Sequence, residues 1–261
     1  MSKQVDWSTV KFRASSWGNL LAEPQSKADK DAGRLGVTCQ KELVKIYNLV
    51  KYGRKKEITT NAMDKGKLLQ SEGIKLFSFV EDEMYEENHE QLENQWFTGT
   101  IDMYTGEAIT SAKKVWDLKC SYELDTFTPK LIESPDKGYE AQLNVYYDLT
   151  NSEGGGLAYV LMDAPPSVLA DEKRRLLYNM DVVSEESPAY VEAAKELEKL
   201  LTFQDIHYTE RVIKQPVERN DDLIEKMKAK VPIFRQWLED FEKKHMSQYP
   251  KQTLLIEAVL K

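Results

Sequence analysis

The chain has 261 residues, of which 41% are hydrophobic and 31% are charged, a composition typical of a globular protein. It contains no apolar run of membrane-spanning length, and its polar first residues lead us to expect no signal peptide. Its two cysteines, Cys39 and Cys120, form neither a disulfide framework nor a metal-binding CxxC motif. We therefore expect a cytoplasmic protein without membrane association, folded as a single domain over residues 1–261.

The charge of the chain is unevenly distributed. The formal net charge of −8 argues against a nucleic-acid partner when it is taken alone. Residues 1–60, however, contain twelve Lys and Arg against six Asp and Glu. A basic N-terminal segment on an acidic body is typical of a protein that contacts phosphates along one surface. For any individual lysine, an ordinary solvated helix face is an equally good explanation.

The first part of the chain is predicted to be helical. The spacing of its apolar residues predicts helices at 11–22, 36–52 and 61–80. Ser15 and Ser16 lie near the start of the first helix, close to Arg13. A helix N-terminus with hydroxyls and a cation nearby can bind a phosphate, and an ordinary serine N-cap is the alternative interpretation.

A β-hairpin is predicted in the middle of the chain, after an acidic segment. This segment covers residues 81–93 and is expected to be an exposed linker or hairpin, and the two strands lie around 97–103 and 114–121. Residues i and i+2 of a strand share a face, so Asp117 and Lys119 point the same way while Leu118 points into the core. Asp102 lies at the end of the first strand. Charge close to a core is costly unless it is paired or binds a metal, so these side chains indicate a cation site with an ammonium beside it.

The rest of the chain alternates between helices and strands. Predicted are a helix at 137–150, a turn at 151–156, a strand at 157–163, helices at 170–178 and 188–201, a strand at 206–214 and a long helix at 221–245. The two charged helices make residues 164–205 longer than a connection between strands requires. We expect this segment to be a helical elaboration that serves oligomer or partner contacts.

The residues of the hairpin resemble the core motif of the PD-(D/E)XK nucleases. Asp102 follows Gly99 at the end of one strand, and Asp117-Leu118-Lys119 lies on the next. Downstream, Gln142 and Tyr146 match the QxxxY element of the RecB-like and phage-exonuclease branch.

The N-terminal segment extends this resemblance. Phe12-Arg13-Ala14-Ser15-Ser16 is similar to the serine-containing opening of phage recombination exonucleases of the lambda and YqaJ type. The four elements occur in the family's order over roughly residues 11–241.

The resemblance implies an α/β fold in which helices flank a central mixed β-sheet, with a restriction-endonuclease-like core. It implies a Mg²⁺-dependent exonuclease, with Mn²⁺ as a substitute, that degrades linear double-stranded DNA from an end during phage-type recombination. The implied partners are DNA ends, a single-strand annealing protein and further copies of the chain. The resemblance implies six catalytic residues: Asp102, Asp117, Lys119, Glu72, Gln142 and Tyr146. The implied metal ligands are Asp102, Asp117, Glu72 and the Leu118 carbonyl. The implied phosphate-binding residues are Arg13, Ser15 and Ser16.

The sequence departs from the family pattern in the helix predicted at 61–80. Gln70 stands four residues after Gly66, where the lambda-type enzymes have glutamate, and Glu72 is the nearest acid. Residues 70 and 72 lie about 200° apart on a helix, so one does not simply replace the other. Either the helix register is shifted or Gln70 acts as a neutral ligand, and Glu72 can equally be a surface residue. A weakly active or inactive domain that binds DNA or protein, or a related endonuclease, is therefore the alternative function.

Overall fold

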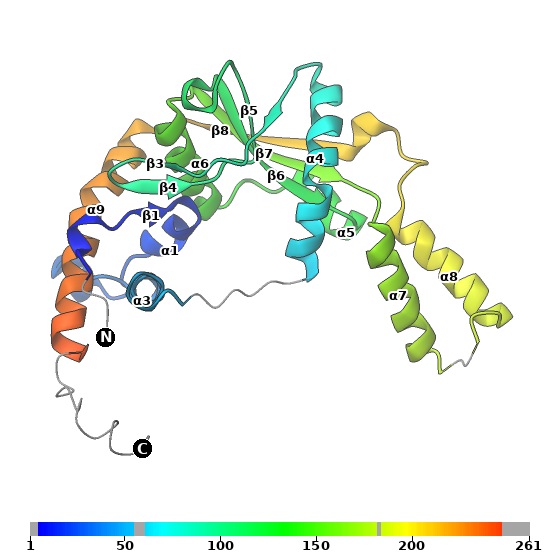
Figure 1. Ribbon diagram of the computed structural model, residues 1–261, viewed down its shortest axis with the longest axis horizontal. Coiled ribbons are helices and arrows are strands. Elements are labelled where there is room, and N and C mark those ends of the chain that lie inside the picture. Colours follow the sequence, from blue (N-terminus) through cyan, green and yellow to red (C-terminus); the bar gives the residue numbers. More distant parts are fainter. Residues whose placement is uncertain (1–4, 55–60, 182–183, 247–261) are drawn as a thin grey trace, which may run out of the picture.

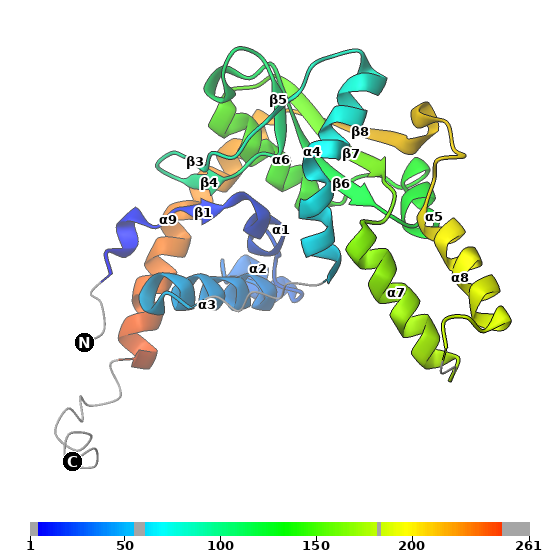
Figure 2. The ribbon, with the colours of Figure 1, turned by 45° about the vertical axis from the view of Figure 1, so that its right-hand side comes forward.

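The computed structural model describes residues 5–54, 61–181 and 184–246. Its α-helices are α1 (Trp17–Leu20), α2 (Lys27–Asp31), α3 (Val37–Tyr52), α4 (Asn61–Glu81), α5 (Leu124–Phe127), α6 (Lys137–Thr150), α7 (Pro166–Asn179), α8 (Pro188–Leu201) and α9 (Asp221–Phe241). Its strands are β1 (Phe12–Arg13), β2 (Glu86–Glu87), β3 (Leu92–Glu93), β4 (Phe97–Gly99), β5 (Met103–Thr105), β6 (Lys114–Ser121), β7 (Gly154–Leu161) and β8 (Val212–Glu218). Figures 1 and 2 show their arrangement.

The larger sheet has five strands in the order β2-β5-β6-β7-β8. The strands β6 and β7 run parallel, whereas the other neighbours in this sheet are antiparallel. A parallel pair requires a crossover connection, and the connection between β6 and β7 contains α6. The chain is therefore an α/β protein with a mixed central sheet flanked by helices, as predicted.

The two faces of this sheet carry separate hydrophobic cores. On one face α4 covers the sheet, and Phe77 of this helix packs against Trp116 of β6 with ring centroids 5.3 Å apart. On the other face α6, α9 and the N-terminal segment form a larger core that includes Trp17 and Phe234. Burial of each such side chain contributes about 1.5–3 kcal/mol. Both surfaces of β6 are thus occupied, and its alternating side chains are divided between α4 and α6.

The strand β7 approaches β6 so closely at position 155 that only glycine fits there. A Cβ atom on Gly155 would lie 1.6 Å from the carbonyl oxygen of Val115, and the φ angle of Gly155 is +157°. The prediction of a turn over 151–156 is therefore wrong for its second half, because the three glycines begin the strand. Gly156 pairs with Trp116 in the same register.

A smaller sheet, in the order β1-β4-β3, corrects two further predictions. Phe12 and Arg13 pair in parallel with β4, so residues 11–22 do not form one helix, and α1 has a single turn. The strand predicted at 97–103 is divided between the two sheets, because β4 pairs with β1 and β3 whereas β5 pairs with β6. Asp102 lies in the break between β4 and β5.

The two helices predicted after β7 are present; α8 has the predicted limits, whereas α7 begins at Pro166 and not at 170. They extend from the sheet as a pair in Figure 2. Proline occupies the first turn of both helices, where its missing N–H is not needed. The last strand lies at Val212–Glu218 and not at 206–214. The helix α9 ends at Phe241 and is followed directly by a π-helical turn at Glu242–Met246, which includes the predicted limit of 245. Within the described ranges, no helix is long and apolar enough to span a membrane.

Candidate active site

Asp102 is held by the backbone of β6. One of its carboxylate oxygens accepts a hydrogen bond of 2.8 Å from the Leu118 N–H, and its own carbonyl accepts one of 3.0 Å from the Asn88 N–H. Burial and the neighbouring carboxylate of Asp117 raise the pKa of Asp102 to about 7, although Lys119 and the Leu118 N–H oppose the change. The Asp117 carboxylate thus lies near the carboxyl group of Asp102, whose ionisation is already made unfavourable by burial.

Asp117 and Lys119 lie on the face of β6 that is turned toward α6, as the strand alternation predicts. Their side chains form an ion pair with Nζ and Oδ2 2.5 Å apart, and the Asp117 side chain is only 4% exposed. The amide of Gln142 donates to Oδ1 of Asp117 at 2.9 Å. The same nitrogen lies 2.9 Å from the Tyr146 hydroxyl. A buried carboxylate with two such partners is fixed in position.

The ammonium of Lys119 also lies over the ring of Tyr139, 5.2 Å from its centroid, within range for a cation–π contact. Burial by itself lowers the pKa of Lys119, but the charge and hydrogen bond of Asp117, together with Tyr139 and Asp102, outweigh it and raise the pKa. Lys119 is therefore a cation throughout the neutral range. We did not predict the role of Tyr139 from the sequence, although its spacing from Gln142 was a usable signal.

The helix α6 presents these side chains because its start is fixed by a cap. The Asp136 carboxylate accepts hydrogen bonds from the backbone N–H groups of Gly138 and Tyr139, at 2.6 and 3.1 Å. Positions three, four and seven residues apart then share one face of the helix, which aligns Tyr139, Gln142 and Tyr146.

Gly99 on β4 leaves space for the side chain of Tyr146 in the site. A Cβ atom on this residue would lie 2.8 Å from Cε1 of Tyr146 and 3.2 Å from Cβ of Ala14. The contact explains why glycine precedes Asp102 in this chain: the strand, the N-terminal segment and α6 meet there without room for a side chain.

The three residues predicted to bind phosphate lie in the N-terminal segment that packs on α6. Arg13 is exposed at the end of β1, and its charge opposes the increase that burial, Asp117 and Asp102 cause in the pKa of Tyr146. Ser15 and Ser16 belong to the 3-10 turn at Ala14–Ser16. Ser16 is the N-cap of α1, yet its side chain makes no capping hydrogen bond. The alternative interpretation of Ser16 as a side-chain cap is therefore wrong.

On α4, Glu72 is exposed and Gln70 is partly buried. The exposed position of Glu72 does not support its predicted role as a metal ligand together with Asp102. Burial, followed by the charge of Asp102, raises the pKa of the Cys120 thiol, and the charge of Glu72 adds to this increase. Another acid, Glu87 of β2, adds to the raised pKa of Asp102 and accepts a hydrogen bond of 2.6 Å from the Ser71 hydroxyl. The sequence predicts an exposed linker or hairpin around Glu87, and the two-residue strand β2 leaves no periodic pattern that would identify it.

Metal ligation by these residues rests on two carboxylates. In the part of the chain that the structure describes, no three His, Cys, Asp or Glu side chains come together as a ready-made metal cluster. The Leu118 carbonyl, Glu72 and the catalytic roles of the other residues stay predictions. What the structure does bring together is the set predicted from the two motifs: Asp102, Asp117, Lys119, Gln142 and Tyr146.

Comparison with known proteins identifies the fold. No protein-family model and no curated protein sequence matches the chain. Among solved structures, a phage-related exonuclease from Haemophilus somnus 129PT matches with a TM-score of 0.68 and 22% identity, over 90% of this chain and 96% of that one. The alkaline exonuclease LHK-Exo from Laribacter hongkongensis matches with a TM-score of 0.58 and 13% identity, over 94% and 98%. LHK-Exo in complex with dAMP also matches, with a TM-score of 0.58 and 14% identity, over 91% and 94%. The chain therefore has the fold of the phage-related and alkaline exonucleases, which confirms its resemblance to the phage recombination branch at the level of fold.

Proposed function

We propose that this protein is a Mg²⁺-dependent DNA exonuclease that hydrolyses linear double-stranded DNA from an end, in phage-type recombination. One observation carries the proposal: Asp102, Asp117 and Lys119 meet where β5, β6 and α6 adjoin, on the fold of known exonucleases. A relative of that fold was solved with a nucleotide, dAMP, which supports a nucleic-acid substrate. The single strand left after such digestion would be the substrate of an annealing protein.

The donor set fits a hard divalent cation. Asp102 and Asp117 would supply carboxylate oxygens, the ligands that Mg²⁺ prefers, and water would supply the remaining ligands. The raised pKa of Asp102 reflects two carboxylates in a partly buried place, an arrangement that a cation stabilises. When bound, Mg²⁺ would lower the pKa of a coordinated water and offset charge on the scissile phosphate. Mn²⁺ has similar ligand preferences and would substitute.

The side chains have distinct tasks in this proposal. Lys119 would orient the attacking water and offset the negative charge that develops on the phosphate, because it remains cationic and is held by Asp117. Gln142 would keep Asp117 oriented, and Tyr146 would keep Gln142 in place.

The N-terminal segment would hold the DNA backbone. Arg13 is exposed next to the site, and the hydroxyls of Ser15 and Ser16 lie on the turn that follows it. A cation and hydroxyl groups at this place would bind the phosphate at the end of a DNA strand. This assignment is independent of the metal and would affect substrate affinity more than the rate of the chemical step.

Nuclease assays test the proposal directly. Purified protein is incubated with linear duplex DNA labelled at either end, and with closed-circular DNA, in Mg²⁺ or in EDTA. We expect progressive shortening of the linear duplex in Mg²⁺ alone, and loss of at least about a hundredfold in rate for Asp117→Asn and Lys119→Met. Lys113→Met, which changes an exposed lysine on the adjacent loop, serves as the matched control. Full activity in either site variant would contradict the proposal, and cleavage of closed circles would indicate an endonuclease.

A second candidate function is a weakly active or inactive domain that binds DNA or protein. It is favoured by Gln70, which stands where related enzymes are expected to have glutamate, and by the exposed position of Glu72. Calorimetric titration with Mg²⁺ and Mn²⁺ separates the two candidates. Metal binding that Asp102→Asn removes supports the enzyme, whereas the absence of metal binding supports the binding domain.

A further inference from the structure

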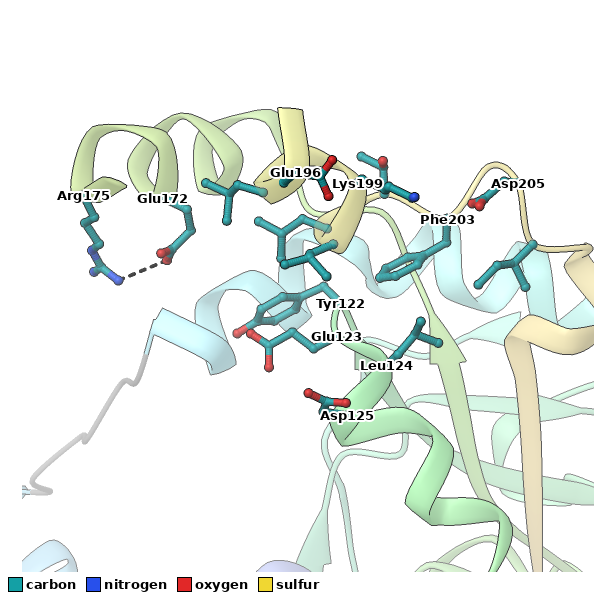
Figure 3. A pocket seen from close by; sticks show the side chains of 15 residues that line it. Tyr122, Glu123, Leu124, Asp125, Glu172, Arg175, Glu196, Lys199, Phe203 and Asp205 are labelled. Atoms are coloured by element: carbon teal, nitrogen blue, oxygen red, sulfur yellow. Dashed lines mark hydrogen bonds and ion pairs between the residues drawn. The ribbon is translucent and has the colours of Figure 1, made fainter. Parts of the chain in front are cut away.

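A groove lies outside the candidate active site, between α7, α8 and the segment after β6. We call it the α7–α8 groove; its volume is about 770 Å³ (Figure 3). Leu124, Leu197, Phe203 and Ile206 contribute to its apolar lining. Leu200 also lines it and is 67% exposed. Large apolar side chains gathered in an open groove mark a surface that is suited to contact with another segment.

The lining of the α7–α8 groove is also acidic. Its lining contains five carboxylates, those of Glu123, Asp125, Glu172, Glu196 and Asp205, against the two cations of Arg175 and Lys199. Figure 3 shows Arg175 directed at Glu172, and the two side chains are 3.0 Å apart. The remaining negative charge disfavours a nucleic acid and favours an apolar segment that carries lysines.

Such a segment is present in the chain itself, at residues 247–261, outside the described residues. Five large apolar residues, Leu254, Leu255, Ile256, Val259 and Leu260, occur within seven positions. Lysines precede and follow this run at 251 and 261. Apolar residues between cations complement a groove whose lining combines apolar side chains with an excess of carboxylates.

The reach of this segment decides which copy of the groove it can enter. Eight Cα–Cα steps lead from Met246 to Leu254 and span at most about 28 Å when the chain is fully extended. A compact chain of 261 residues has a radius of gyration of about 18 Å and hence a diameter of about 45 Å. Figures 1 and 2 place the end of α9 and the α7–α8 pair on opposite sides of the molecule. The groove of the same copy is therefore out of reach.

We propose that residues 247–261 of one copy bind in the α7–α8 groove of a second copy. The contact joins two different surfaces, so it is heterologous, and each copy has one groove and one segment to offer. It does not depend on the nuclease activity proposed above.

Sedimentation of the full-length chain over a range of concentrations tests this contact. We expect the wild-type chain to self-associate, and we expect Leu200→Glu in the groove and Leu255→Glu in the segment each to weaken association roughly tenfold or more. Tyr178→Glu is the matched control, because Tyr178 is 86% exposed on α7 but does not line the groove. This control should associate like the wild-type chain.

Mixing the two variants gives the sharper result. The Leu200→Glu chain keeps an intact segment and the Leu255→Glu chain keeps an intact groove, so an equimolar mixture should form a one-to-one complex that neither variant forms alone. A monomeric wild-type chain, unchanged self-association of Leu255→Glu, or a mixture that stays monomeric would each overturn the proposal. Nuclease assays of the same samples report separately on the active site.

Discussion

Replacing Asp102 with asparagine is expected to stabilise the metal-free protein, increasingly so as the pH rises. The pKa of Asp102 is raised from 3.8 to about 7 by burial and by Asp117. Between these values the folded protein holds a proton that the unfolded chain has released, so the folded state loses stability as the pH increases. Asparagine carries no such proton and can still accept the hydrogen bond from the Leu118 N–H.

The size of this effect follows from the same pKa change. Between pH 5 and pH 8, a carboxyl whose pKa rises from 3.8 to about 7 costs the folded state about 2.5 kcal/mol. Water at the partly buried carboxyl reduces this figure to roughly 1–2 kcal/mol. For a chain of this length the difference in melting temperature between Asp102→Asn and wild type should therefore grow by about 2–8 °C.

Thermal unfolding in EDTA at pH 5 and pH 8 measures this difference. Glu107→Gln is the control, because it removes an exposed carboxylate from the loop between β5 and β6. Adding Mg²⁺ at pH 8 should stabilise the wild-type chain and leave Asp102→Asn nearly unchanged. A difference in melting temperature that is the same at both pH values would refute the reasoning about the two carboxylates.

Two further substitutions test the geometry around α6. Gly99→Ala places a Cβ atom 2.8 Å from the Tyr146 ring and should lower the free energy of unfolding, measured by urea titration, by about 1–3 kcal/mol. The control is Gly154→Ala, whose Cβ would meet only the Val217 carbonyl at 3.8 Å and which should lower the same free energy by under about 1 kcal/mol. Equal losses in the two variants would contradict the crowded contact at Gly99. Gln142→Leu removes the hydrogen bonds to Asp117 and Tyr146 and should lower kcat about 10–100-fold with little change in KM, and a wild-type kcat would exclude a positioning role.

The parts of the site that local periodicity governs were predictable from the sequence. Alternation along β6 placed Asp117 and Lys119 on one face and Leu118 on the other. Helical spacing placed Gln142 and Tyr146 together on α6, whose predicted limits agree with the structure. Both patterns depend only on backbone geometry within one element, and that geometry does not change with the partners of the element.

Features that depend on pairing between distant segments were not predictable. Phe12 and Arg13 form a strand only because β4 lies beside them, and β4 is separated from β5 because each pairs with a different sheet. Glu87 comes near Asp102 through a two-residue strand, too short to leave a pattern in the sequence.

The sequence by itself determined which chemical groups this protein offers: two carboxylates, a lysine, and a glutamine and tyrosine four residues apart. The tertiary structure alone decided how the groups of different elements come together and how deeply they are buried. The ion pair of Asp117 and Lys119, the raised pKa of Asp102 and the contact of Tyr146 with Gly99 arise where β5, β6, α6 and the N-terminal segment pack together. The physical reason is that burial and proximity are properties of packed segments, and the free energy of a charge depends on both.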